Sequence, residues 1–216
     1  PSMTELRITE IFLSLQGEAS SVGRPTVFVR LTGCPLRCQY CDSAYAFSGG
    51  DLWRLDKIVE AVAAYGVPLV TVTGGEPLAQ PGVTQLMQTL LDKGFEVSLE
   101  TSGALSIEAV PTGVSCVVDL KTPGSAEAHR NHWPNMGLLK PIDQVKFVVC
   151  DRADYDWARM RCDEYDLYHK VAEVLFSPSY EQLMPKDLAD WIVADRLPAR
   201  MQLQMHKLLW GDVPGR

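Results

Sequence analysis

The chain has 216 residues, 46% of them apolar, and a formal net charge of −7. This length supports one sizeable core and is short for two, so we expect a single domain over residues 1–216. An acidic chain lacks the clustered Lys and Arg side chains that neutralise phosphates, which excludes nucleic acid and anionic membrane surfaces as expected partners.

The sequence does not suggest a membrane or secreted protein. No apolar run reaches the roughly 18 residues of a membrane helix, and the start lacks a basic segment followed by an apolar one. We therefore expect a cytoplasmic protein. Pro1 and Ser2, before Met3, resemble an expression scar and support no inference.

Residues 5–15 alternate apolar and polar side chains, which predicts a strand. The loop Gln16-Gly17-Glu18 follows it. The expected buried face of this strand consists of Leu6, Ile8, Ile11 and Leu13.

A second strand is predicted over residues 26–31. Alternation places Arg30 on the face of Phe28, opposite the apolar residues of the same strand. An arginine inside an apolar strand needs an anionic partner. Two partners are open: Glu18 or another carboxylate of the chain, or the carboxylate of a ligand held by the guanidinium fork.

Three cysteines, Cys34, Cys38 and Cys41, follow this strand within eight positions. A structural zinc site takes four protein ligands, and so does a [4Fe-4S] cluster that only transfers electrons. Three thiolates leave one metal position open for a cofactor or substrate, which favours a catalytic cluster. The alternative is a partial zinc site completed by His129, His132 or His206.

The other three cysteines do not share this spacing. Cys116, Cys150 and Cys162 lie in or near apolar segments. We interpret them as reduced packing residues, not as metal ligands or disulfides.

The remainder of the chain alternates predicted strands and helices, which is typical of an α/β fold with a mainly parallel sheet. The predicted helices span residues 56–65, 83–93, 155–170 and 186–194. The predicted strands span residues 69–73, 95–99, 116–120, 144–150, 173–176 and 201–204. Proline and glycine mark residues 103–144 as largely loop. We therefore predict an abbreviated, partly open parallel (β/α) barrel instead of a full eight-fold barrel.

Polar motifs follow the predicted strands at their carboxyl ends, which is where parallel barrels assemble active sites. These motifs are residues 16–18, 34–41, 74–76 and 100–101, Lys121 and Ser177. We expect them to meet at one rim of the barrel.

The spacing C-x3-C-x2-C, with Tyr40 before the last cysteine, resembles the signature of the radical S-adenosylmethionine (SAM) enzymes. Gly74-Gly75-Glu76-Pro77, one predicted helix later, resembles the GGE element of the same superfamily. The resemblance implies a barrel of the radical SAM type in which Cys34, Cys38 and Cys41 hold a [4Fe-4S] cluster, whose fourth iron binds SAM. The SAM-binding residues that it implies are Tyr40, Asp42, Gly75, Glu76, Glu100, Ser102, Asp119, Leu120, Lys121, Ser177, Pro178, Ser179 and Tyr180.

Further segments resemble one branch of that superfamily, the 7-carboxy-7-deazaguanine synthases (QueE) of queuosine and deazapurine biosynthesis. These segments are Gln16-Gly17-Glu18, Arg30, Cys41-Asp42-Ser43 and Gln204-Met205-His206-Lys207. The resemblance implies a homodimeric lyase that converts 6-carboxy-5,6,7,8-tetrahydropterin into 7-carboxy-7-deazaguanine with loss of ammonia. Radical chemistry suits this reaction because the hydrogen removed from the pterin is not acidic enough for an ordinary base.

The same resemblance implies how substrate and Mg2+ are held. Ser43 stands where the family commonly has a threonine that offers its hydroxyl to Mg2+, and serine keeps that oxygen. An external, flavodoxin-like electron donor would reduce the cluster. The implied substrate-binding residues are Leu15, Gln16, Gly17, Glu18, Arg30 and Thr73, with Arg30 pairing with the pterin's carboxylate.

Two other functions are open at this point. A radical SAM activase would make a glycyl radical on a partner protein, and such enzymes also join a small barrel to this cysteine spacing. A zinc-binding scaffold domain would have no catalytic role. Gln16, Arg30 and Ser43 favour a polar pocket for a small anionic molecule over a groove for a peptide.

Overall fold

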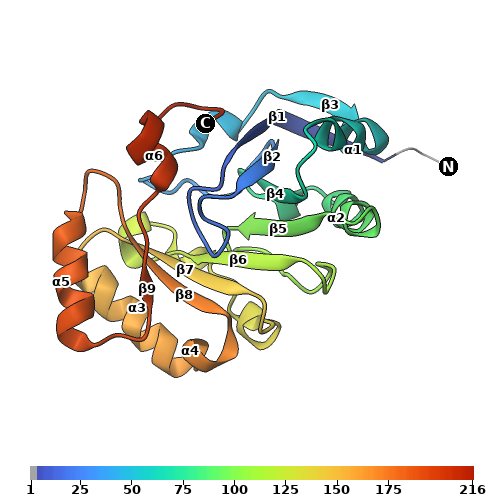
Figure 1. The fold of residues 1–216 in the computed structure, drawn as a ribbon. Coiled ribbons are helices and arrows are strands. Elements are labelled where there is room, and N and C mark those ends of the chain that lie inside the picture. Colours follow the sequence, from blue (N-terminus) through green and yellow to red (C-terminus); the bar gives the residue numbers. More distant parts are fainter. Residues whose placement is uncertain (1–3) are drawn as a thin grey trace.

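The computed structural model describes residues 4–216, which form a sheet with helices packed against it (Figure 1). Pro1 and Ser2, the expected expression scar, lie outside these residues. Across residues 4–216, nine strands pair in the order β3-β1-β2-β4-β5-β6-β7-β8-β9. The strands are β1 (Glu5–Leu15), β2 (Pro25–Leu31), β3 (Asp51–Arg54), β4 (Leu69–Gly74), β5 (Glu96–Thr101), β6 (Ser115–Leu120), β7 (Gln144–Val149), β8 (Glu173–Pro178) and β9 (Arg200–Met201). The α-helices are α1 (Leu55–Ala64), α2 (Val83–Asp92), α3 (Arg152–Glu164), α4 (Leu167–Lys170), α5 (Pro185–Asp195) and α6 (Met205–Trp210).

The sheet is mostly parallel. From β2 to β9 every neighbouring pair of strands runs parallel, whereas β1 is antiparallel to both β2 and β3. β3 and β9 are its two edges, so the sheet stays open within the described residues. α1 and α2 lie along the β1–β5 half, and α3, α4 and α5 lie along the β6–β9 half (Figure 1). The predicted partly open parallel (β/α) barrel is confirmed.

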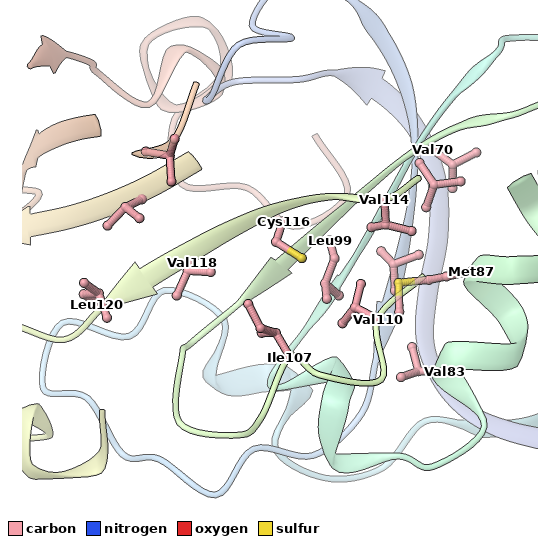
Figure 2. Packing of buried hydrophobic residues seen from close by; sticks show 14 of the residues in the cluster. Val70, Val83, Met87, Leu99, Ile107, Val110, Val114, Cys116, Val118 and Leu120 are labelled. Atoms are coloured by element: carbon pink, nitrogen blue, oxygen red, sulfur yellow. The ribbon is translucent and has the colours of Figure 1, made fainter. Parts of the chain in front are cut away.

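The main core lies between the sheet and its helices. Val83 and Met87 of α2 reach the sheet beside Val70 and Leu99 (Figure 2). Each of these four side chains is 1% exposed or less. Burying a side chain of this kind stabilises the fold by about 1.5–3 kcal/mol. Because the valines of β4 face the helices, its threonines face the interior of the barrel.

β1 contains a β-bulge at Thr9. Ile8 pairs with Leu31, whereas Glu10 pairs with Arg30, so β1 has one residue more than β2 over this stretch. A bulge inverts the alternation of side chains beyond it. Glu10, which simple alternation from the buried Ile8 would turn into the core, therefore lies on the face of Arg30.

The predicted buried face of β1 is right for Leu6, Ile8 and Ile11, which lie in or against the core. It is wrong for Leu13, whose exposed fraction is 41%. In the described chain β3 pairs with Glu5–Ile8 alone, so the far half of β1 is a sheet edge. Leu13 lies near the end of that edge, where few neighbours cover it.

Other elements also differ from the sequence prediction. The predicted helix over residues 155–170 is divided into α3 and α4, because Asp166 adopts a positive φ of 53° that interrupts helical geometry. The predicted strand over residues 201–204 shortens to Arg200–Met201. β3 and α6 were not predicted, since elements of four and six residues are too short to show a period. Across residues 4–216 no helix combines the length and the apolar character needed to cross a bilayer.

The six cysteines are free thiols. Cys116 and Cys162 are buried in the core, which confirms the prediction that they are packing residues. The prediction is wrong for Cys150, which lies half-buried just after β7 and outside the described core cluster.

The loop between β1 and β2, residues 16–24, reaches strands near the opposite edge of the sheet. The Ala19 amide donates to Gln202 Oε1, just beyond β9, at 2.9 Å. The Ser20 amide donates to Gln144 Oε1 on β7 at 2.9 Å. Because β1 is antiparallel to β2, this loop lies at the amino ends of the parallel strands, where it joins the first strands to the last. The prediction that residues 16–18 share the carboxyl rim with the other motifs is therefore wrong, although Gln16 and Glu18 do line the cavity.

Leu6→Ala is expected to lower the free energy of unfolding by about 3 kcal/mol, because it empties a fully buried site on β1. Leu13→Ala on the same strand is the matched control, with an expected change within about 0.5 kcal/mol because its side chain is exposed. Urea unfolding of both variants measures the difference. Equal losses would contradict the difference in burial between the two side chains.

Candidate active site

A cavity of about 230 Å³ opens at the carboxyl ends of the parallel strands. Its lining combines strand ends, the cysteine loop (residues 33–43) and segments that follow β8 and β9. The predicted site residues that line it are Leu15, Gln16, Glu18, Arg30, Cys34, Cys38, Tyr40, Cys41, Asp42, Ser43, Thr73, Gly75, Glu100, Ser102, Asp119, Lys121, Pro178, Ser179 and Tyr180. Gly17, Glu76, Leu120 and Ser177 lie outside that lining.

Cys34, Cys38 and Cys41 are half-buried free thiols on the wall of the cavity. Burial raises the pKa of Cys34, and it raises that of Cys38 to about 11. Metal binding at these sulfurs must therefore displace protons. In the described part of the chain, no three His, Cys, Asp or Glu side chains gather closely enough to hold one metal ion. A cubane cluster is larger than an ion, so its three thiolates need not converge on one point.

Gly75 lets the end of β4 approach the cysteine loop. A Cβ at this position would lie 2.2 Å from the Gly33 carbonyl oxygen and 3.0 Å from Cys34 Cβ. The next amide, of Glu76, donates to the same Gly33 oxygen at 2.8 Å. Only glycine permits this contact, which seats the first cysteine against a strand end.

The Glu76 carboxylate points into the protein. Its Oε1 accepts hydrogen bonds from Thr101 Oγ1 at 2.6 Å and from the amide and hydroxyl of Ser102, each at 2.7 Å. Its Oε2 accepts from the Leu78 amide at 2.9 Å. The fully buried side chain thus ties the end of β4 to the end of β5.

Four alternating charges, Glu18, Lys146, Asp119 and Lys121, line the interior and are called the charge row below. Lys146 Nζ lies 2.8 Å from Glu18 Oε1 and 4.0 Å from Asp119 Oδ2, and Lys121 Nζ lies 3.0 Å from Asp119 Oδ2. Burial alone would lower the pKa of each lysine, but the neighbouring carboxylates raise it above its usual value. Both ammonium groups therefore stay charged.

Lys146 was missed at the sequence level. It lies on β7 among valine and phenylalanine residues, and only 14% of its side chain is exposed. The reasoning that singled out Arg30, a cation inside an apolar strand, applies to it equally.

Arg30 finds its anionic partner in Glu10. Its Nε donates to Glu10 Oε1 at 2.7 Å, and its Nη1 donates to the Gly74 carbonyl at 3.2 Å. Glu18, the partner considered first from the sequence, pairs instead with Lys146. Arg30 still lines the cavity, so a ligand can reach it.

The wall near Arg30 is partly aromatic. Phe12 and Phe28 stack with ring centroids 5.1 Å apart and planes 13° apart, and both line the cavity. Sequence reasoning did not identify Phe12 as a site residue, although the predicted buried face with Ile11 and Leu13 leaves Phe12 on the side of Phe28. A flat aromatic ligand can pack against such a wall.

Polar groups of β4 and of the loop after β1 surround Glu100 on β5. Its carboxylate accepts from Thr73 Oγ1 at 3.0 Å and from Gln16 Nε2 at 3.4 Å, and Gln16 Nε2 also donates to Thr71 Oγ1 at 3.1 Å. Burial and the nearby Glu18 carboxylate raise the pKa of Glu100 above its usual value.

Ser43 and Asp42 present oxygen atoms together. Ser43 Oγ donates to Asp42 Oδ1 at 2.9 Å, and Lys207 Nζ lies 3.0 Å from Asp42 Oδ2. Burial alone would raise the pKa of Asp42, but the Lys207 ammonium holds it well below its usual range. A hydroxyl beside an ionised carboxylate is a hard-oxygen donor set of the kind that Mg2+ prefers.

Two buried polar atoms of the lining have no hydrogen-bond partner among residues 4–216. They are Tyr40 Oη and Asp119 Oδ1. Native proteins rarely leave such atoms unsatisfied, and a ligand in the cavity would supply partners. A third such atom, Ser177 Oγ, lies just before the lining residue Pro178.

The C-terminal segment completes the site. Gln204 and His206 line the cavity, and the Met205 amide donates to the Gly17 carbonyl at 3.0 Å. A Cβ on Gly17 would lie 2.0 Å from His206 Nδ1. Gly17 is therefore a packing position that admits His206 to the cavity wall.

Lys146→Met is expected to lower the free energy of unfolding by about 3 kcal/mol, because it leaves Glu18 largely buried without its cation. Urea unfolding at equal iron content measures the loss. Lys57→Met removes a lysine whose pair with Glu60 is more than half exposed, so we expect a loss within about 1 kcal/mol. Similar losses in both variants would show that the charge row contributes no more than a surface ion pair.

Comparison with known proteins gives a consistent result. Residues 28–112 match the family model described as Radical SAM superfamily. The chain is 42% identical to the 7-carboxy-7-deazaguanine synthase of Koribacter versatilis, over 95% of this chain and 97% of that protein. It is also 42% identical to the 7-carboxy-7-deazaguanine synthase of Chlorobaculum tepidum, over 95% of this chain and 94% of that protein.

Solved structures show the same fold at lower identity. The crystal structure of QueE from Escherichia coli matches with a TM-score of 0.70 and 20% identity, over 94% of this chain and 95% of that one. Streptococcus suis SuiB bound to its precursor peptide matches with a TM-score of 0.57 and 13% identity, over 80% of this chain and 46% of that one.

Proposed function

Because the chain belongs to the 7-carboxy-7-deazaguanine synthase family of radical SAM enzymes, we propose that its cavity holds the cofactors and a carboxylated pterin side by side. The protein is a radical SAM lyase that converts 6-carboxy-5,6,7,8-tetrahydropterin to 7-carboxy-7-deazaguanine with loss of ammonia. Its cofactors are a [4Fe-4S] cluster and SAM. The observation that carries the proposal is that three free cysteines, the charge row and Arg30 line one cavity.

Cys34, Cys38 and Cys41 are the proposed cluster ligands. Their exposure on one wall and the close seating of Cys34 against Gly75 support this assignment. When bound, the cluster and SAM supply hydrogen-atom abstraction from the substrate. The chain's own task is to orient the two molecules and exclude water from them.

SAM is proposed to lie between the cysteine loop and the ends of β5, β6 and β8. The unsatisfied Tyr40 Oη and Asp119 Oδ1 support this placement, as do Gly75, Ser102 and Lys121 along the same lining. Glu76 lies outside the cavity lining and would support the SAM site indirectly, by holding the ends of β4 and β5 together. Pro178, Ser179 and Tyr180 line the far side of the cavity, where the adenosine end would fit.

The substrate is proposed to lie against Phe12 and Phe28. Arg30 would then receive its carboxylate, and Gln16, Glu18 and Thr73 would meet the polar edge of the pterin. Because Glu18 is held by Lys146 at 2.8 Å, it stays in place as an acceptor for ring N–H groups.

Mg2+ is proposed to bind at Ser43, with the ionised Asp42 beside it. One protein oxygen is enough when substrate and water complete the octahedral shell. The metal would draw electron density from substrate oxygens during the rearrangement.

The two rival functions are less well supported. The relatives that cover nearly the whole chain bear the synthase name, not that of an activase. A zinc scaffold would not need an arginine, an aromatic wall and a charge row around its cysteines.

We propose further that the enzyme is a single-domain, cytoplasmic homodimer that receives electrons from a flavodoxin-like donor. Leu208 and Leu209 of α6 are 70% and 53% exposed and offer an apolar surface for a second copy. The net charge of −7 supports a small-molecule substrate over nucleic acid or membrane.

Cys38→Ala is expected to abolish iron binding and SAM cleavage, because two thiolates cannot retain the cluster. Iron and sulfide analysis after anaerobic reconstitution, with chromatographic detection of 5′-deoxyadenosine, measures both losses. Cys162→Ala, a buried cysteine on α3, is the matched control and should keep the iron content. SAM cleavage by Cys38→Ala would refute the ligand assignment.

Ser43→Ala is expected to raise the Mg2+ concentration needed for half-maximal activity by at least about tenfold, because it removes the hydroxyl that is proposed to bind the metal. Ser43→Thr keeps the oxygen and should behave like the natural chain. Activity measured across a Mg2+ series, with SAM affinity measured separately, distinguishes metal binding from damage to the SAM site. An unchanged Mg2+ dependence in Ser43→Ala would argue against this site.

A further inference from the structure

Glu10 occupies its position because of the bulge at Thr9. Bulges often lie beside active sites, where they re-aim a side chain. Here the extra residue turns Glu10 from the core side of β1 to the side of Arg30, its direct partner on β2. The two side chains are 21% and 14% exposed, so this is a largely buried ion pair.

The pair leaves part of the Arg30 guanidinium available. Glu10 Oε1 accepts a hydrogen bond from Nε–H, and the Gly74 carbonyl accepts one from Nη1–H. A guanidinium has five N–H groups, so within residues 4–216 three of them, including both on Nη2, keep no hydrogen-bond partner. Arg30 lines the cavity, so a ligand there can reach these groups.

The same carboxylate oxygen also accepts a hydrogen bond from the turn that follows the cysteine loop. Tyr45 Oη donates to Glu10 Oε1 at 2.7 Å, and Tyr45 lies in the 3-10 turn η1 (Ala44–Ala46), directly after Ser43. The Arg30 guanidinium lies 5.6 Å from the centre of the Tyr45 ring, which adds a cation–π contact.

We propose that Glu10 is a positioning residue that aims the outer N–H groups of Arg30 at the carboxylate of the substrate, and that Tyr45 couples this arrangement to the cysteine loop. The inference rests on the proposed role of Arg30 in substrate binding. It assigns to Glu10 and Tyr45 the selection of carboxylated over carboxylate-free pterins.

Two opposing effects act on substrate affinity when Glu10 is deleted. Removal of the negative Glu10 carboxylate favours binding of an anionic substrate. The same removal leaves Arg30 Nε without its acceptor, so the guanidinium can rotate away from the substrate carboxylate. Two oriented hydrogen bonds to a carboxylate outweigh one repulsion acting across the guanidinium. The net effect of deletion is weaker binding.

Substrate affinity of the SAM-loaded enzyme, measured anaerobically without reductant, tests the proposal. The probes are 6-carboxytetrahydropterin and tetrahydropterin without the carboxylate. Glu10→Ala should weaken binding of the carboxylated probe by about tenfold, the value of one lost charged hydrogen bond, and leave the other probe unchanged. Glu10→Gln keeps an acceptor oxygen for both Arg30 and Tyr45 and should stay within about threefold of the natural chain. SAM affinity and iron content should not change.

Matched variants locate the effect. Glu5→Ala removes an exposed glutamate from the same strand and should have no effect. Tyr45→Phe removes only the phenol donor and should weaken the carboxylated probe by less than Glu10→Ala does. In an Arg30→Ala background, Glu10→Ala should have no further effect on affinity.

Several outcomes would overturn the proposal. Tighter binding by Glu10→Ala would identify Glu10 as a competing anion, and equal losses for both probes would identify a structural role. Additive losses in Glu10→Ala with Arg30→Ala would show that Glu10 does not act through Arg30. If Arg30→Ala alone leaves affinity for the carboxylated probe unchanged, the proposed role of Arg30 fails first, which is distinguishable from failure of Glu10 alone.

Discussion

The contact between Gly75 and Gly33 is the constraint on which the site depends. With no side chain at Gly75, the end of β4 meets the cysteine loop backbone to backbone, and the Glu76 amide extends the hydrogen bonding of the strand into that loop. The Glu76 carboxylate then fixes β4 to Thr101 and Ser102 of the next strand end. The cysteines are consequently held on rigid elements, as a reactive centre that must not drift requires.

The charges inside the barrel are arranged as pairs of opposite sign. Buried charges destabilise a fold unless they are paired, which explains why Arg30 has Glu10 and why Lys146 has Glu18. Each pair still presents unused donors or acceptors to the cavity. A polar substrate therefore meets groups that are already oriented, and little reorganisation accompanies its binding.

Sequence reasoning reached the outline of the site and missed its details for physical reasons. The cysteine spacing and the position of Arg30 are local features, so they are readable from the chain. Lys146 obeys the same rule as Arg30 and was overlooked. The predicted buried face of β1 already left Glu10 and Phe12 on its other side, but neither was identified as a site residue. The pairing of Glu10 with Arg30 was not accessible, because it depends on the register between β1 and β2. Glu76 was expected to face SAM, yet its carboxylate is committed to β5 by contacts that no local pattern encodes.

The loop that joins β1 to β2 has a consequence for how the enzyme is made. Its amides bond to Gln144 and Gln202, so residues near the start of the chain are held by residues 124 and 183 positions later. Contacts between residues so far apart in the sequence form slowly, because the chain loses conformational entropy before these contacts stabilise it. The cysteine loop lies between these partners in the sequence, and Gln204 and His206, which follow the last strand, line the same cavity. The cavity that would hold the cluster is therefore complete only once the segment after β9 has folded against the loop after β1.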